Sequence, residues 1–105
     1  MSIQTANVGI TDTTTFTSVG GQSAVTLMSL CNYGAVSQTV SVYIVTATNS
    51  ASDANIFVKE IEIAPADTFI IYQGGEKIIL DEDDSIVAIA SAANAVTAIT
   101  SYMII

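Results

Sequence analysis

The segment that decides the fold is TVSVYIVT, residues 39–46. Val40, Val42 and Ile44 fall on one face of an extended chain, and Ser41 and Tyr43 fall on the other. This alternation in a segment rich in β-branched residues indicates a half-buried β-strand, because successive side chains of a strand point to opposite faces. We therefore expect a strand at 39–46 whose valine side faces a core.

The rest of the chain has a similar plan of short apolar segments separated by turn formers. Gly20-Gly21, the loop 49–53 and Pro65 are breaks of this kind, and Gly74-Gly75 suggests a turn into a short return strand. The expected strands cover 23–32, 39–46, 56–63, 69–72, 78–80, 85–91 and 96–105. Seven or eight short strands at about ten-residue spacing, without a helix, predict an all-β fold: a single antiparallel β-sandwich or jelly-roll-like domain.

Residues 1–18 differ from the rest because they are polar and rich in threonine. Their large apolar side chains are too few for a core of their own: Ile3, Val8, Ile10 and Phe16. Two interpretations stay open: an extended arm that lies along a neighbouring subunit, or an edge strand of the chain's own sandwich. The expected sandwich domain then covers 19–105.

Composition excludes several classes of function. The net charge is −8, there are two basic residues (Lys59 and Lys77), and there is no histidine. Nucleic-acid binding and attraction to anionic membranes both need clustered basic residues, so neither is expected. Charged residues are 11% of the chain, against about 25% in ordinary soluble domains. We therefore expect part of the surface to be buried in an oligomer or against a partner.

Two segments near the C-terminus support this expectation because they are apolar on both faces. If Ile86, Ala88 and Ala90 face the core, Val87 and Ile89 face away from it. Residues 96–105 repeat the pattern, and strands of this kind are usually covered on both sides. We expect a homo-oligomer, with a trimer as the working guess. The interface candidates are Val87, Ile89, Ile99, Met103, Ile105 and Phe16.

The candidate chemical groups are few. Asp81, Asp83 and Asp84 belong to the densest acidic run and are weak candidates for a cation, which prefers carboxylate ligands. The run lacks the spacing of an EF-hand loop, and a solvated turn is the simpler interpretation. Glu60 and Glu62 resemble a carboxylate pair but have no sugar cleft around them. We assign no catalytic residue, cofactor or metal, and expect no enzyme activity.

Cys31 and the tyrosines have structural interpretations. Cys31 lies in an apolar segment without a histidine to activate it, so we expect an inert, buried thiol. The tyrosines could stack on sugars, anchor an interface or pack within the sandwich. They are Tyr33, Tyr43, Tyr72 and Tyr102.

Several segments resemble a group of small phage proteins. These segments are LCN at 30–32, QTVSVYIV at 38–45, IAPADT at 63–68, DSI at 84–86 and ASAANAV at 90–96. The chain is similar over about residues 20–105 to short β-sandwich proteins of tailed-phage virions, which serve as decoration, head-appendage or tail-associated parts. Where related sequences often have a basic or polar residue, this chain has Val87 and Ile89.

The resemblance implies a virion structural protein. Its expected role is a multi-copy accessory subunit that decorates or cements the capsid, or is attached to the neck or tail, with itself and capsid or tail subunits as partners. Residues 1–5 lack the features of a signal peptide, so we expect synthesis in the host cytoplasm and assembly into the virion. A carbohydrate- or receptor-binding β-sandwich module is the alternative function.

Overall fold

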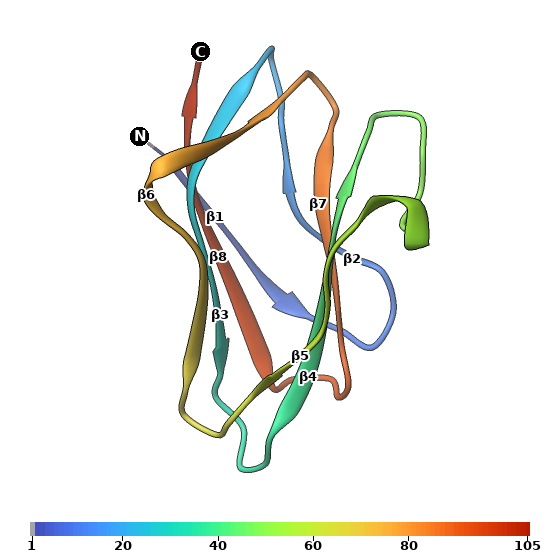
Figure 1. The fold of residues 1–105 in the computed structure, drawn as a ribbon, viewed down its shortest axis with the longest axis vertical. Coiled ribbons are helices and arrows are strands. Elements are labelled where there is room, and N and C mark those ends of the chain that lie inside the picture. Colours follow the sequence, from blue (N-terminus) through green and yellow to red (C-terminus); the bar gives the residue numbers. More distant parts are fainter. Residues whose placement is uncertain (1) are drawn as a thin grey trace.

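The computed structural model describes residues 2–105, and of residues 72–77 it describes the strand but not the side chains. It contains eight strands and one short 3-10 helix, shown in Figure 1. The elements are β1 (Ser2–Val8), β2 (Thr13–Thr17), β3 (Ser23–Asn32), β4 (Gln38–Val45), η1 (Asp53–Asn55), β5 (Ile56–Ile63), β6 (Thr68–Leu80), β7 (Ser85–Ala90) and β8 (Val96–Ile104).

The strands form two four-stranded sheets that pack face to face. Sheet A has the order β1-β8-β3-β6, sheet B has the order β2-β7-β4-β5, and all neighbouring strands are antiparallel. Every connection crosses from one sheet to the other except the one between β4 and β5. This is the strand order of a jelly roll. The expected all-β sandwich is therefore confirmed.

The alternation at residues 39–46 has the expected cause. β4 is an inner strand of sheet B, between β7 and β5. Val40 and Val42 have no exposed surface and belong to the core. Ser41 lies on the outer side, where its Oγ accepts a hydrogen bond of 2.9 Å from the backbone N–H of Glu60. The small polar residue in the alternation therefore binds the neighbouring strand.

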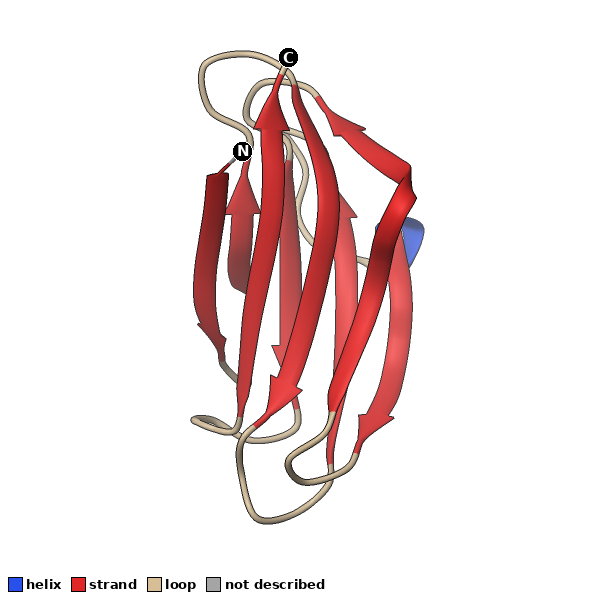
Figure 2. Cartoon of the chain, turned by 90° about the vertical axis from the view of Figure 1, so that its left-hand side faces the viewer, coloured by secondary structure: helices blue, strands red, loops and turns tan. Residues whose placement is uncertain are grey.

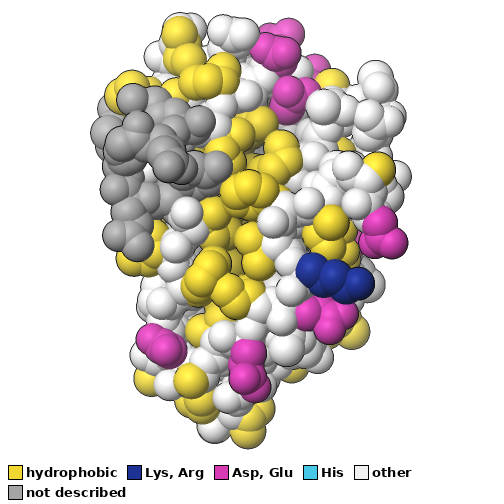
Figure 3. Space-filling model, viewed as in Figure 1, with side chains coloured by type: hydrophobic (Ala, Val, Ile, Leu, Met, Phe, Trp, Pro, Cys, Tyr) yellow, Lys and Arg dark blue, Asp and Glu magenta, His cyan; other side chains and the backbone are white. Residues whose placement is uncertain are grey.

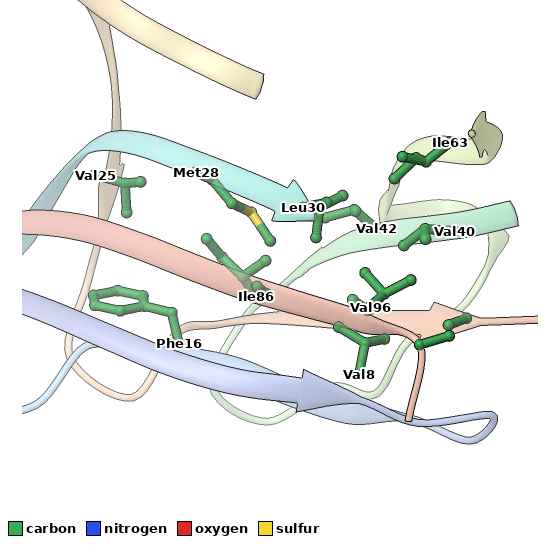
Figure 4. Close-up of a cluster of buried hydrophobic side chains, with 14 of the residues drawn as sticks. Val8, Phe16, Val25, Met28, Leu30, Val40, Val42, Ile63, Ile86 and Val96 are labelled. Atoms are coloured by element: carbon green, nitrogen blue, oxygen red, sulfur yellow. The ribbon is translucent and has the colours of Figure 1, made fainter. Parts of the chain in front are cut away.

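The core lies between the two sheets and includes side chains from both (Figure 4). Met28 and Leu30 of sheet A, like Ile86 of sheet B, are at most 2% exposed. Phe16 has no exposed surface, and its ring centroid lies 4.8 Å from that of Tyr102 at an interplanar angle of 60°. A tilted contact at this distance is a favoured arrangement of aromatic pairs.

Residues 2–17 form two edge strands of this sandwich. β1 pairs with β8 in sheet A, and β2 pairs with β7 in sheet B. Val8 and Phe16 have no exposed surface, so each strand contributes a core side chain. The arm interpretation is therefore wrong for this chain, and the sandwich begins at Ser2 rather than at residue 19. Phe16 is likewise a core residue and not an interface residue.

The expected hairpin around Gly74-Gly75 does not form. Both glycines lie among residues 72–77, and residues of β6 on both sides of this segment pair with β3. Phe69 pairs with Leu30 and Ile78 pairs with Val25, so both halves of β6 lie along the same strand, β3. The register shifts between Val25 and Leu27. Between these pairs β6 has more residues than β3, so the extra residues form an irregularity within β6. A bulge of this kind lengthens a strand without reversing it.

One buried side-chain hydroxyl has no hydrogen-bond partner among the described residues. Thr100, in β8, has no exposed surface, and its Oγ1 makes no hydrogen bond within the described part of the chain. Replacing it with valine keeps the side-chain shape and removes the unsatisfied hydroxyl. We expect Thr100→Val to raise the free energy of unfolding by about 1 kcal/mol in urea denaturation.

Thr15 provides the matched control for this change. It is 3% exposed, and its Oγ1 donates a hydrogen bond of 3.1 Å to the carbonyl of Ile86. Thr15→Val removes the donor of this hydrogen bond, so we expect it to lower the free energy of unfolding by about 1 kcal/mol. Equal destabilisation by both changes would contradict the assignment of Thr100 as unsatisfied.

Candidate interaction surface

The acidic run at 81–84 forms a turn whose carboxylates cap the backbone. Asp84 accepts hydrogen bonds of 3.0 Å from the N–H of Ala47 and of 3.0 Å from the N–H of Asp81. Asp81 accepts a further bond of 2.8 Å from the side chain of Gln22. Asp83 is at φ 69°, in the left-handed region. No three potential metal ligands come together in the part of the chain that the structure describes.

Glu60 and Glu62 do not form a matched carboxylate pair. Glu60 lies at a bulge of β5 with φ 49°, where Val58 and Ile61 pair with Val42 and Val40. Both glutamates are exposed. Glu60 borders a hollow of about 280 Å³, and it is the one acidic residue among the described side chains that line this hollow. General acid–base chemistry on a sugar needs two opposed carboxyl groups, and this hollow supplies one.

Cys31 lies on the outer side of sheet A rather than in the core. It pairs with Thr68 on β6 and with Thr97 on β8, and it is partly exposed. The expectation of a buried thiol is therefore wrong. The neighbouring residue, Asn32, points inward and is completely buried, since side chains alternate along β3.

The three described tyrosines do not gather at one end of the sandwich. Tyr33 is half-exposed in the turn after β3 and donates a hydrogen bond of 3.2 Å to Asn7 Oδ1. Tyr43 lies on β4, and Tyr102 packs on Phe16 in the core region. Tyr72 belongs to the residues whose side chains are outside the description. A tyrosine-lined sugar site therefore finds no support among the three described tyrosines.

A second hollow, larger than the one beside Glu60, has a mostly polar lining. It measures about 420 Å³ and is lined by Ile44, Thr46, Asn49, Ser50, Ser52, Ala54 and Asn55. Several of its polar groups are already bonded within the loop: Asn55 donates to the carbonyl of Ser50 and accepts from the N–H of Ser52. Ligand sites are usually lined by hydrophobic and aromatic side chains with a few free polar groups. None of the described residues that line this hollow is aromatic.

The outer face of sheet A is a candidate interaction surface. We call it the A face; it is the side of sheet A that points away from sheet B, and it faces the viewer in Figure 2. The strand register sets its rows across neighbouring strands. The rows are Thr5–Ile99–Ser29–Ile70, Ile3–Ser101, Met103–Ala24–Ile79 and Asn7–Thr97–Cys31–Thr68.

Isoleucine and methionine side chains stand exposed on the A face. Ile79 is 51% exposed, and Ile70, Ile99 and Met103 are 37–39% exposed. The residues between them are mostly small and polar, and Thr26 Oγ1 donates a hydrogen bond of 3.2 Å to the carbonyl of Ser101. Large apolar side chains exposed together on one face can mark an interaction site in a soluble protein.

The A face carries no charged side chain among its described residues. The described charges lie on β5 (Lys59, Glu60 and Glu62), at the start of η1 (Asp53), and in loops and turns (Asp12, Asp67 and the acidic run at 81–84). The remaining two charged residues of the sequence, Glu76 and Lys77, belong to the residues without described side chains. The described charges therefore all lie away from the A face.

The predicted interface residues separate into two groups. Ile99 and Met103 lie on the A face, and Ile105, 66% exposed, follows directly after β8. Val87 and Ile89 point outward from sheet B, as the alternation predicted, but Val87 is only 6% exposed because Thr14 and Tyr43 flank it. Ile89 is partly buried beside the smaller hollow. Val87 is therefore not available as an interface residue.

A second apolar strip runs along the side of the sandwich between β5 and β6. Figure 3 shows hydrophobic side chains down the middle of this side. Val58 and Ile61 of β5, together with Phe69 and Ile71 of β6, are partly buried and pack against the core from this side. On the opposite side, the Gln4 side chain of β1 bridges to β2. Its Nε2 donates a hydrogen bond of 3.3 Å to the carbonyl of Thr17, and its Oε1 accepts one of 3.3 Å from the N–H of Thr17.

Comparison of the chain with family models, curated proteins and solved structures finds no match. Among the described residues, no helix has the length and hydropathy needed to span a membrane.

Proposed function

We propose that the chain is a non-enzymatic structural subunit that docks through its A face, as a multi-copy accessory protein of a phage virion. In this role it decorates or cements the capsid, or is attached to the neck or tail. The observation that carries the proposal is the A face itself, a sheet surface with exposed isoleucines and without described charges. The segments that resemble virion β-sandwich proteins support the choice of particle.

Docking through the A face would remove its side chains from water. Burying a charge is costly unless it is paired, and the described part of the A face has no charge to bury. From a strand rise of about 3.4 Å and a strand spacing of about 4.8 Å, four strands of roughly eight residues cover about 500 Å². Two such faces reach the roughly 1,000 Å² that a specific interface needs.

The alternative, a carbohydrate-binding module, has weaker support. Its best candidate is the hollow of about 420 Å³, whose described lining consists of asparagine, serine and threonine residues with Ile44 and Ala54, and offers no aromatic platform. A glycan array with the purified chain tests it directly. Retention of the wild-type chain on defined sugars, abolished by Asn49→Ala, would favour this function over a purely structural one.

Substituting lysine at the centre of the A face tests the proposed function. Ile99→Lys places a charge in the middle of the docking surface, and we expect at least a 100-fold weaker affinity for particles made from the genome that encodes the chain. Co-sedimentation of purified chain with particles stripped of it measures this affinity. Ile10→Lys is the matched control, because Ile10 is 61% exposed in the turn between β1 and β2, away from the A face.

Cys31 supplies an independent readout, since it is the single cysteine of the chain and lies on the A face. Its reaction with a thiol reagent should slow when the chain is bound to particles. Mass spectrometry of separated heads and tails then places the protein within the particle. Absence of the chain from purified particles, or equal binding by Ile99→Lys and Ile10→Lys, would contradict the proposal.

A further inference from the structure

The four sheet edges of this sandwich are not equivalent. An exposed edge strand presents unpaired backbone groups, and proteins usually blunt such edges with charges, prolines, bulges or covering groups. β5 carries three charged residues and shifts its register against β4 twice. β6 shifts its register against β3 twice.

The β2 edge is blunted in three ways. It is only five residues long, and its register against β7 shifts between Thr14 and Phe16. The Gln4 side chain also covers it, bonding both the N–H and the carbonyl of Thr17. Little of this edge is left for another strand.

β1 has none of these features. Its sequence, SIQTANV, contains no charge and no proline. It pairs with β8 without interruption from Ser2 opposite Tyr102 to Val8 opposite Val96. In an antiparallel ladder alternate residues point their N–H and carbonyl groups toward a given neighbour. On its outer side β1 has no neighbouring strand in sheet A, so this edge is regular and open (Figure 2).

We propose that β1 pairs antiparallel with β1 of a second copy of this chain about a two-fold axis, which joins two A sheets into one sheet of twice the width. The inference rests on the proposed function and deepens it by naming the partner at this edge. It also makes the assembly unit a dimer, in place of the trimer expected from the sequence.

The sequence and register of β1 favour a second copy as the occupant, because a regular strand without charges can pair antiparallel with its own copy. A chain with a net charge of −8 repels its own copies, and this repulsion is weakest where the surfaces that meet carry no charge. β1 is such a place, and the charged strand β5 belongs to the opposite edge of the other sheet. Pairing here also joins the two A faces into one surface of about 1,000 Å² per dimer, which increases the area available for docking.

The symmetric register that pairs all seven residues of β1 is centred on Thr5. In it Thr5 lies opposite its own copy, with Cβ atoms about 5 Å apart. Ile3 then lies opposite the partner's Asn7, and Gln4 opposite the partner's Ala6. A charge at position 5 would face an identical charge across the axis, which makes this position the most sensitive one for a test.

Sedimentation of three lysine variants over a concentration series tests the pairing. We expect Thr5→Lys to weaken the dimer by at least about tenfold, because like charges directly opposite destabilise a strand pair. Thr14→Lys is the matched control on the β2 edge, where the threonine is also exposed, and we expect it to leave the dimer intact. Ile70→Lys lies in the same A-face row as Thr5 but on the far strand, and should leave the dimer intact while weakening particle binding.

Cross-linking tests the same register without relying on a destabilising variant. In a Cys31→Ser background, Thr5→Cys should form a disulfide-linked dimer under mild oxidation, and Thr14→Cys should not. Cross-linking equal in both variants, or a dimer lost in Ile70→Lys but kept in Thr5→Lys, overturns the β1 pairing in favour of contact through the A face. A monomeric wild-type chain that still binds particles through Ile99 overturns the dimer and leaves the proposed function intact.

Discussion

Replacing Phe16 by alanine is expected to lower the free energy of unfolding by about 3–5 kcal/mol, the usual cost of truncating a buried phenylalanine. The side chain has no exposed surface and its ring packs on Tyr102, so the change leaves a cavity between the sheets. Small domains are stable by about 5–15 kcal/mol in total. We therefore expect a fall in melting temperature of well over 10 °C, measured by calorimetry.

This result separates the two interpretations of residues 1–18. If Phe16 belonged to an arm lying on another subunit, Phe16→Ala would weaken assembly and leave the melting temperature of the monomer almost unchanged. Phe57→Ala is the matched control, because Phe57 lies on β5 and is 42% exposed. We expect it to cost clearly less, and an equal loss of stability in both variants would contradict the placement of Phe16.

Replacing Asn32 by leucine is the second change with a large expected effect. Asn32 has no exposed surface. Its Nδ2 donates to the carbonyls of Val36 (2.8 Å) and Ile63 (2.9 Å), and its Oδ1 accepts from the N–H of Gly34 (2.9 Å). The side chain thus ties the turn after β3 to the end of β5 in the other sheet.

Asn32→Leu leaves all three of these backbone groups without their partner. At about 1 kcal/mol for each lost bond, and more for groups left buried and unsatisfied, we expect a loss of about 3–4 kcal/mol in urea denaturation. Asn32→Asp keeps the acceptor for Gly34 but places a carboxylate against two carbonyl oxygens, so it should be at least as destabilising.

Asn49→Leu is the control for this residue type. Asn49 is exposed, and its side chain donates a hydrogen bond to the hydroxyl of Thr46 within the same loop. Surface changes of this kind usually stay within about 0.5 kcal/mol. A similar loss of stability in both variants would show that the buried network around Asn32 does not stabilise the fold.

Local pattern was sufficient for the fold class. The alternation at 39–46 correctly separated Val40 and Val42 from Ser41, and the same rule placed Ile86, Ala88 and Ala90 in the core. The breaks at glycine, proline and asparagine clusters located most strand ends. These features could be predicted because the two-residue period of a strand and the conformational preferences of turn residues are properties of the local chain.

The same rule could not say which face of a strand is covered, or by what. Cys31 lies in an apolar segment but points outward, because a register shift in β3 between Val25 and Leu27 changes which residues face the core. Val87 points outward as predicted and is still buried, because side chains of the two neighbouring strands flank it. The A face itself combines residues from four strands that are far apart in the sequence.

The sequence by itself therefore determined the all-β class, the approximate strands and the scarcity of charge. Only the tertiary structure decided that residues 2–17 are two edge strands, that β6 continues past its glycines, and that the uncharged side chains share one face. The physical reason is that strand pairing is a long-range interaction. Order within a sheet and register depend on partners such as β8 for β1, separated by most of the chain, and no local preference of Ser2–Val8 specifies them.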